Sequence, residues 1–195
     1  MAKSDDNQRE FEDNIKVGDK RIAVVIGKKG STKREIEERT GAKLTINSET
    51  GNVNIKAEDG LKLFTALNVV KAISRGFNPK VAIKLTSAEY QFDIIRITDY
   101  VSSKNALYRV RGRIIGTNGR SRKKIEELTD TNMVIFGKTV GIIGDYRGAK
   151  LAKEAITDLI EGSPHSTVFK WLEREHVKRS QDKLLEMYGA NKDEI

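Results

Sequence analysis

The 195-residue sequence contains no cysteine and only two histidines, and aromatic residues make up 6% of it. The absence of cysteine excludes disulfides, thiol nucleophiles and cysteine-ligated zinc. His165 and His176 have no clustered carboxylate beside them, which argues against a catalytic or metal-binding role. So few aromatic rings also argue against a sheet surface that stacks bases. The sequence therefore predicts a protein without cofactor, metal or enzymatic activity.

Long apolar runs are absent as well. None approaches the roughly 20 residues that a membrane helix needs, and residues 1–14 lack the apolar core of a secretory signal. We therefore expect a cytoplasmic protein. Acidic residues are fewer than basic ones. The sequence has 28 Asp and Glu and 36 Lys and Arg, which gives a net charge of +8. This excess favours a polyanionic partner, although a membrane surface would attract the same charge.

The chain contains one pattern twice, offset by 89 positions. The residues that coincide include Ile26, Gly27, Gly30, Ile36 and Thr40 in the first copy, and Ile115, Gly116, Gly119, Ile125 and Thr129 in the second. A single Gly-x-x-Gly segment could simply precede a helix. Two copies flanked by basic residues favour a duplicated nucleic-acid-binding domain.

Each copy has the same expected order of elements. In the first, we predict a strand at 11–17, a short apolar helix at 21–26, a glycine loop at 27–30, a helix at 31–40, strands at 42–47 and 52–57, and a helix at 59–76. In the second, we predict a strand within 90–98, a loop at 101–106, helices at 107–115 and 120–129, strands at 132–136 and 139–143, and a helix from Asp145.

A last helix, from Ser163-Pro164 to Gly189, has no counterpart in the first copy. We expect it to pack on the second copy through Val168, Trp171, Leu172, Leu184, Leu185 and Tyr188, and to expose Lys170, Arg174, Lys178 and Arg179. The expected organisation is a disordered start at 1–10, a first domain at 11–79, a linker at 80–89, a second domain at 90–189 and a tail at 190–195.

The glycine loops suit phosphate binding. Glycine has no Cβ, so a phosphodiester can approach the main chain, and the following helix presents unpaired N–H groups and the positive end of its dipole. Basic side chains surround both loops, and no acidic residue occurs between Arg109 and Lys124. Gly141 to Gly144 also has the sequence Gly-x-x-Gly, but it lies within a predicted strand, so we assign it no role in phosphate binding.

The order of elements and the loops Gly27-Lys28-Lys29-Gly30 and Gly116-Thr117-Asn118-Gly119 resemble the eukaryotic-type KH domain. The resemblance implies an α+β fold of two tandem type I KH domains, each a three-stranded antiparallel sheet with three helices on one face, plus the extra C-terminal helix. It also implies that each loop clamps about four nucleotides of single-stranded nucleic acid over an apolar groove. Candidates for the groove are Ile26, Leu44, Ile46, Ile115, Val134 and Ile135.

The RNA-binding residues implied for the first domain are Ile26, Gly27, Lys28, Lys29, Gly30, Lys33 and Arg34. For the second domain they are Arg111, Arg113, Ile115, Gly116, Thr117, Asn118, Gly119, Arg120, Arg122, Lys123 and Val134. Two features depart from the family pattern. Lys33 and Arg122 stand where an apolar residue is usual, and the second loop carries no charge of its own.

Segments 111–129, 137–144 and 161–173 resemble one family more narrowly, the archaeal two-KH ribosome-assembly factor related to the eukaryotic partner of the Nob endonuclease. This resemblance implies binding to the 3′ region of small-subunit ribosomal RNA during maturation. It also implies a Nob-type endonuclease and a translation initiation factor subunit as partners. The alternative from another class is a docking scaffold, in which one KH copy binds a partner protein instead of RNA.

Overall fold

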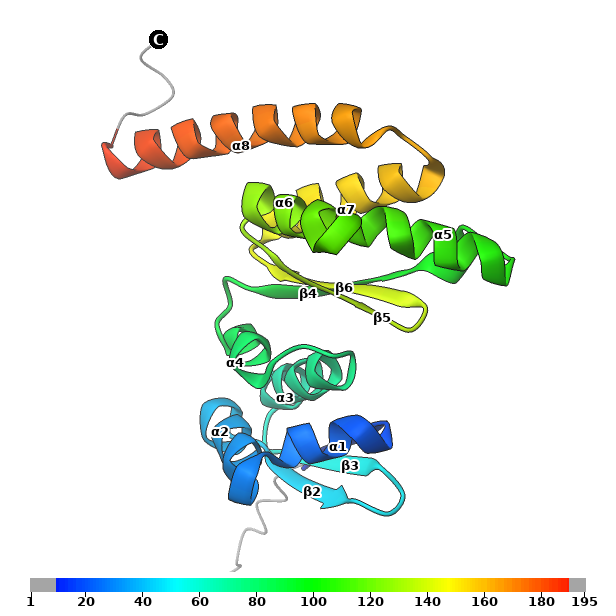
Figure 1. Cartoon of the computed structure of the whole chain (residues 1–195). Coiled ribbons are helices and arrows are strands. Elements are labelled where there is room, and N and C mark those ends of the chain that lie inside the picture. Colours follow the sequence, from blue (N-terminus) through cyan, green and yellow to red (C-terminus); the bar gives the residue numbers. More distant parts are fainter. Residues whose placement is uncertain (1–9, 190–195) are drawn as a thin grey trace, which may run out of the picture. The chain divides into compact units, whose positions relative to one another are not determined.

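The computed structural model describes residues 10–189 and divides into two units after Phe92, each described here by itself (Figure 1). The expected disordered start and the expected tail at 190–195 lie outside the described residues, apart from the exposed Glu10. Within 10–189, every helix is too short or too polar to cross a membrane.

The first unit begins with a three-stranded antiparallel sheet and three helices. In chain order the elements are β1 (Phe11–Lys16), α1 (Asp19–Ile26), α2 (Ser31–Thr40), β2 (Lys43–Asn47), β3 (Asn52–Ala57) and α3 (Gly60–Ser74). The strands lie in the order β1-β3-β2, with Phe11 opposite Ala57 and Leu44 opposite Ile55. Because side chains alternate along a strand, Leu44, Val53 and Ile55 share the buried face.

The segment expected to be a linker belongs to the first unit. Asn78 caps α4 (Pro79–Ala82) by accepting a hydrogen bond from the Lys80 N–H at 3.0 Å, and a 3-10 turn (Ile83–Thr86) follows. Both pieces pack against α3, where Ala82, Ile83 and Leu85 are buried. The apolar residues of this segment therefore extend the first core.

The second unit repeats the arrangement and adds one helix. Its elements are β4 (Gln91–Arg96), α5 (Lys104–Ile115), α6 (Arg120–Thr129), β5 (Asn132–Phe136), β6 (Thr139–Gly144), α7 (Tyr146–Glu161) and α8 (His165–Met187). The sheet order is β4-β6-β5, and α5, α6 and α7 lie on one side of it (Figure 1). The α+β fold class, with two three-stranded antiparallel sheets and an additional C-terminal helix, is thus confirmed. The predicted loop at 101–106 is shorter than expected, because Ser103 caps α5 by accepting from the Ala106 N–H at 3.1 Å.

Helix α8 contacts α6 and α7 on their side away from the sheet (Figure 1). Val168 and Leu172 are buried there, as predicted. The core assignment of Leu184, Leu185 and Tyr188 is wrong, since these side chains are 51%, 38% and 81% exposed. Their turns extend beyond the helices that α8 covers.

Arg179, predicted on the exposed side of α8, is 6% exposed instead. Its Nη1 donates to the carbonyl oxygen of Thr129 at 2.7 Å, and its Nη2 donates to the carboxylate of Asp145. Arg179 is buried because a C-terminal carbonyl of α6 and the capping carboxylate of α7 attract a cation to this point.

Candidate nucleic-acid interface

The two glycine loops have the same backbone conformation. Each joins two helices, α1 to α2 in the first unit and α5 to α6 in the second. The first glycines have φ/ψ of 74°/174° (Gly27) and 71°/172° (Gly116). The third loop residues, Lys29 and Asn118, lie in the left-handed region with φ 53° in both. A strained conformation repeated in two copies points to function rather than chance.

The two glycines of a loop are required for different reasons. A Cβ on Gly116 would lie 2.6 Å from Cβ and 2.8 Å from N of Ser121, so the loop packs there against its own helix. A Cβ on Gly119 would meet nothing within 4 Å, although its φ of 76° favours glycine. The same division holds for Gly27 and Gly30. The second glycine of each loop therefore faces open space, where an RNA backbone could approach.

No side chain caps the helix after either loop. The N-cap residues are Gly30 for α2 and Gly119 for α6, and neither can supply a capping oxygen. The N–H of the first helical residue donates to a loop carbonyl, from Ser31 to Lys28 O in the first unit and from Arg120 to Thr117 O in the second. The positive end of each helix dipole nevertheless faces the loop and attracts an anion there. This geometry fits a phosphate at the mouth of each loop.

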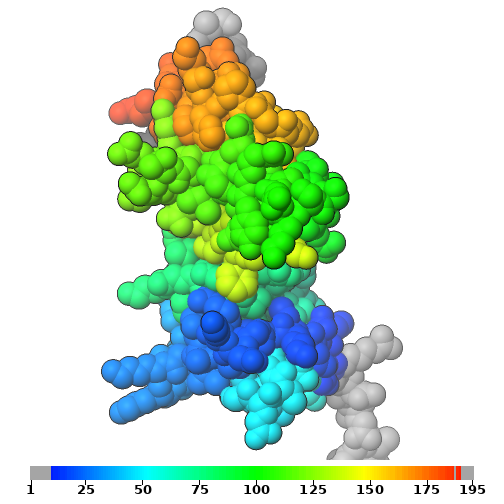
Figure 2. All heavy atoms as spheres, turned by 45° about the vertical axis from the view of Figure 1, so that its right-hand side comes forward, coloured from blue at the N-terminus to red at the C-terminus, as the bar shows by residue number. Residues whose placement is uncertain are grey.

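Basic side chains near the loops differ in how free they are. Lys28 and Lys29 are exposed, and Arg34 donates to the Lys29 carbonyl oxygen at 3.1 Å. In the second unit Arg120 and Lys123 are exposed. Figure 2 shows long side chains projecting from the segments around residues 30–40 and 120–130. The surface beside each loop is thus rich in exposed positive charge.

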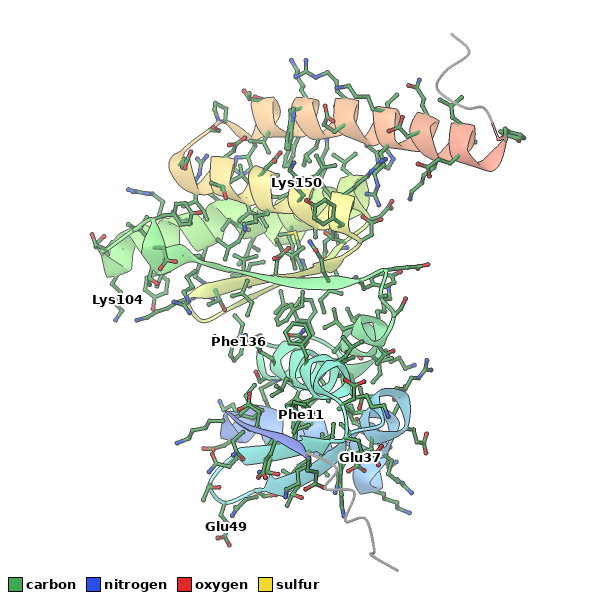
Figure 3. The ribbon with its side chains drawn as sticks, turned by 180° about the vertical axis from the view of Figure 1, so that it is seen from behind. Phe11, Glu37, Glu49, Lys104, Phe136 and Lys150 are labelled. Carbon is green, nitrogen blue, oxygen red and sulfur yellow. The ribbon has the colours of Figure 1, made fainter. Side chains whose placement is uncertain are left out.

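The two residues that depart from the family pattern have matching partners. Lys33 Nζ lies 3.8 Å from Glu37, and Arg122 Nε lies 3.3 Å from Glu126. Each glutamate also accepts a hydrogen bond from the first core residue of the next strand. Glu37 of α2 (Figure 3) accepts from the Leu44 N–H at 2.8 Å, and Glu126 of α6 accepts from the Met133 N–H at 2.7 Å. The charges of these cations are therefore partly neutralised by the neighbouring glutamates.

Arg111 and Arg113, both predicted to bind RNA, leave α5 in different directions. Arg113 donates from Nε to Leu159 O at 3.1 Å and from Nη2 to Ser163 O at 2.7 Å. Arg111 instead lines a hollow of about 470 Å³ between α5 and the β5–β6 turn, together with Tyr108 and Lys138. Its buried Nε has no hydrogen-bond partner within residues 10–189. Arg111 is therefore the better placed of the two to bind a ligand.

The residues predicted to line the apolar groove differ in exposure and in the face of the sheet on which they lie. Ile26, Ile46, Ile115 and Ile135 are half-buried at the surface, whereas Leu44 is 1% exposed and belongs to the core. Val134 pairs with Gly141, so it lies on the opposite sheet face from the neighbouring core residue Met133. The register thus places Ile135, not Val134, on the helix side. Sequence reasoning missed Tyr108 of α5 and also Lys138, which the tight β5–β6 turn brings beside that helix.

Comparison with known families and proteins agrees with this geometry. Residues 12–65 match the KH domain and residues 91–177 match the eukaryotic type KH-domain (KH-domain type I). A KH domain-containing protein of Methanocaldococcus jannaschii is 41% identical over 197 residues, which cover 93% of this chain and 86% of that protein. The RNA-binding protein pno1 of Dictyostelium discoideum is 35% identical over 133 residues, which cover 65% of this chain and 55% of that protein, so the chain spans only about half of this relative.

Among solved structures, the a/eIF2alpha-aDim2p-rRNA complex from Pyrococcus horikoshii contains a chain that matches with a TM-score of 0.81 and 46% identity. The match covers 87% of this chain and 96% of that one. The paired KH domains, the repeated loops and these relatives together show that the chain belongs to the archaeal branch of the PNO1/Dim2 family of RNA-binding ribosome-assembly factors.

Proposed function

We propose that this protein binds the 3′ region of small-subunit ribosomal RNA, as a single strand, during ribosome maturation and without catalysing a reaction. The observation that carries the proposal is the pair of identical glycine-loop backbones, each opening an uncapped helix beside half-buried isoleucines. An aDim2p chain crystallised with ribosomal RNA shares 46% of its residues with this one, which supports the choice of RNA.

In this proposal each loop holds the sugar–phosphate backbone and each groove holds bases. A phosphate lies against Gly30 or Gly119, where the open side of the loop admits it. The adjacent bases rest on Ile26 and Ile46 in the first domain, and on Ile115 and Ile135 in the second. Contact with apolar side chains and helix N–H groups suits single strands, because their bases are free to turn inward.

The charged residues take separate parts. Lys28, Lys29 and Arg34 in the first domain, and Arg111, Arg120 and Lys123 in the second, contact phosphates directly. Lys33 and Arg122 contribute at reduced strength because Glu37 and Glu126 lie beside them. We assign Arg113 a positioning role, since its guanidinium is bound to the carbonyls that end α7 and precede α8.

The proposed protein partners are a translation initiation factor subunit and a Nob-type endonuclease, in the cytoplasm. The first is supported by the P. horikoshii complex, which joins a/eIF2alpha, aDim2p and ribosomal RNA. The second follows from relationship to the PNO1 proteins. Among the described residues, no group of three or more His, Asp or Glu could hold a metal ion.

The test replaces Thr117 and Asn118 together by Asp in the full chain. Aspartate tolerates the left-handed conformation of position 118, and both side chains are exposed, so the fold is preserved. Two carboxylates beside a phosphate should weaken binding of a small-subunit 3′-end RNA at least about tenfold. Fluorescence anisotropy measures this loss, with Lys150→Asp on α7 (Figure 3) as the control for a charge change elsewhere. Unchanged RNA affinity in the double variant would show that this loop does not bind the RNA.

The same experiment on the first loop uses Lys28→Asp with Lys29→Asp. We expect both loop variants to lose affinity, because the two loops share one backbone conformation. If only one of them loses affinity, the other KH domain is the one available for docking a protein. Measuring both variants on the same RNA therefore separates the two-site proposal from the scaffold alternative.

A further inference from the structure

A hollow of about 590 Å³ lies on the α8 side of the second glycine loop, among α5, α6 and the first turn of α8. It differs from the hollow that Arg111 lines, which lies between α5 and the β5–β6 turn. The side chains around the hollow include Arg109, Arg113, Arg120, Lys124, His165 and Phe169. Four of its lining residues are Arg or Lys and none is Asp or Glu, so its field is positive.

The cations of this hollow are held in different ways. Arg113 is fixed by two backbone carbonyls, which leave its charge without a carboxylate. Lys124 is paired with Glu173 at 2.6 Å and lies 5.0 Å from the centre of the Phe169 ring. Arg109 and Arg120 are exposed and have no ion-pair partner within the described part of the chain. Two free cations and one fixed cation thus remain for a ligand.

The first domain lacks this feature. At the 89-residue offset, the four basic residues of the hollow have mostly uncharged or acidic counterparts. Arg109 corresponds to Lys20, Arg113 to Val24, Arg120 to Ser31 and Lys124 to Glu35. Its helices are also not followed by a counterpart of α8. The concentration of positive charge is therefore specific to the second domain, and a KH fold can form without it.

Gly112 provides an independent sign of a ligand. It lies inside helix α5 and lines the hollow, although glycine in a helix interior is less stable than alanine. A Cβ at Gly112 would meet nothing within 4 Å, so the fold gives no steric reason for glycine. The corresponding residue of the first domain is Ala23, which accepts a hydrogen bond from Gly27 just as Gly112 accepts one from Gly116. A bare backbone facing a positive hollow is what close approach by an anion requires.

We propose that this hollow binds a phosphodiester of the RNA that flanks the four or so nucleotides held by the second loop. The inference rests on the proposed function and extends the RNA path past the loop toward α8. His165 joins the site to α8, because its Nε2 lies 2.9 Å from the Arg113 carbonyl oxygen. The extra helix would then lengthen the RNA-binding surface of the second domain.

The test compares a short and a long RNA on the full chain. The first loop is silenced by Lys28→Asp and Lys29→Asp, so that binding reports the second domain. One RNA has only the nucleotides that the loop clamps, and the other extends by several nucleotides on both sides. Arg109→Ala should weaken the long RNA about threefold through one lost phosphate contact and leave the short RNA nearly unchanged, because Arg109 takes no part in the loop site. Equal loss on both RNAs, or no loss on either, would overturn the proposal.

Gly112→Ala gives a second test. Its expected result, a more stable protein that binds RNA more weakly, could not be caused by a folding defect. This substitution should raise the urea midpoint of unfolding, because alanine favours the helix, yet weaken binding of the long RNA about threefold or more. The matched variant is Ala23→Gly, which should lower the midpoint and leave second-domain binding unchanged. A more stable Gly112→Ala protein with full affinity for the long RNA would contradict the site. Thr117→Asp with Asn118→Asp, run in parallel, shows separately whether the loop itself binds RNA.

Discussion

Arg113 of α5 donates a hydrogen bond from Nη2 to the carbonyl oxygen of Ser163, 2.7 Å away, immediately before Pro164 and the start of α8. The first domain contains the same device at another position. There Arg21 of α1 donates from Nε to Ile73 O at 2.8 Å and from Nη2 to Phe77 O at 2.6 Å, and burial lowers its pKa. In both domains an arginine satisfies the carbonyls at the end of the last KH helix.

Replacing either arginine by alanine should destabilise its domain by about 2–4 kcal/mol, since charge-assisted hydrogen bonds are lost and carbonyls are left unpaired. Arg113→Lys should recover less than half of this free energy, because an ammonium cannot span two carbonyls as a guanidinium does. Urea unfolding followed by circular dichroism measures the change. Lys123→Ala, at an exposed position near the loop, is the matched control. An Arg113→Ala protein as stable as that control would show that the two hydrogen bonds contribute nothing.

The two glycines of the second loop should respond differently to alanine. Gly116→Ala places a methyl group 2.8 Å from the Ser121 nitrogen at a backbone conformation, φ 71° and ψ 172°, that is almost confined to glycine. We expect a loss of about 2–4 kcal/mol. Gly119→Ala meets open space and carries only the left-handed cost of about 1–2 kcal/mol. Equal losses in the two variants, measured by thermal unfolding, would mean that packing against Ser121 is unimportant.

Much of the fold was predictable from the sequence, because the two domains have the same sequence pattern and each supports the interpretation of the other. The glycine loops, the paired strands and the helix boundaries depend on local residue patterns, and the structure has them close to the predicted positions. The direction of individual side chains was not predictable in the same way. The sheet face of Val134, opposite to that of Met133, depends on register, because a shift by one residue moves a side chain to the other face.

Long-range contacts explain the other differences at the site. Arg113 looked like a phosphate ligand because it lies in a basic cluster, but its partners Leu159 and Ser163 are 46 and 50 residues away. Arg179 followed a polar pattern along α8, and Thr129 O binds it from 50 residues away. Local sequence patterns do not reveal hydrogen bonds between residues so far apart. A cluster of basic residues in the sequence therefore suggests more positive charge free to bind RNA than the folded protein has.

Arg179 should be among the most sensitive residues of the second domain. It is buried, and its removal would leave the Asp145 carboxylate and the Thr129 carbonyl without their cation. Arg179→Ala should cost about 3–5 kcal/mol, whereas Lys178→Ala, with a side chain 68% exposed, should stay within about 0.5 kcal/mol of wild type. Chemical denaturation of the two variants tests this contrast between neighbours. Similar stability in both would place Arg179 outside the network.

Asp130 ends α6 in the left-handed region with φ 52°, where the first domain has Gly41. Its carboxylate lies 3.5 Å from both Arg179 and Lys183, but at 54% exposure these pairs contribute only about 0–1 kcal/mol. Asp130→Gly relieves about 1 kcal/mol of backbone strain and should be nearly neutral. Asp130→Ala keeps the strain and loses both pairs, so it should be the less stable variant by about 1 kcal/mol. Unfolding at low and at high salt measures both parts, and a more stable alanine variant would contradict this account.

The salt dependence of RNA binding should reveal how many phosphates the free cations contact. With about five contacts, the logarithm of the association constant should fall with a slope of about −3.5 against the logarithm of salt concentration on single strands. Lys28→Ala with Lys29→Ala should reduce the slope by about 1.4, because each lost contact removes about 0.7. Lys33→Ala should change it less, since Glu37 already lies 3.8 Å from that ammonium group. Anisotropy titrations at several salt concentrations give all three slopes. A flat response in the wild type would exclude electrostatic clamping of the backbone. A full change of about 0.7 for Lys33→Ala would show that the ion pair to Glu37 opens when RNA binds.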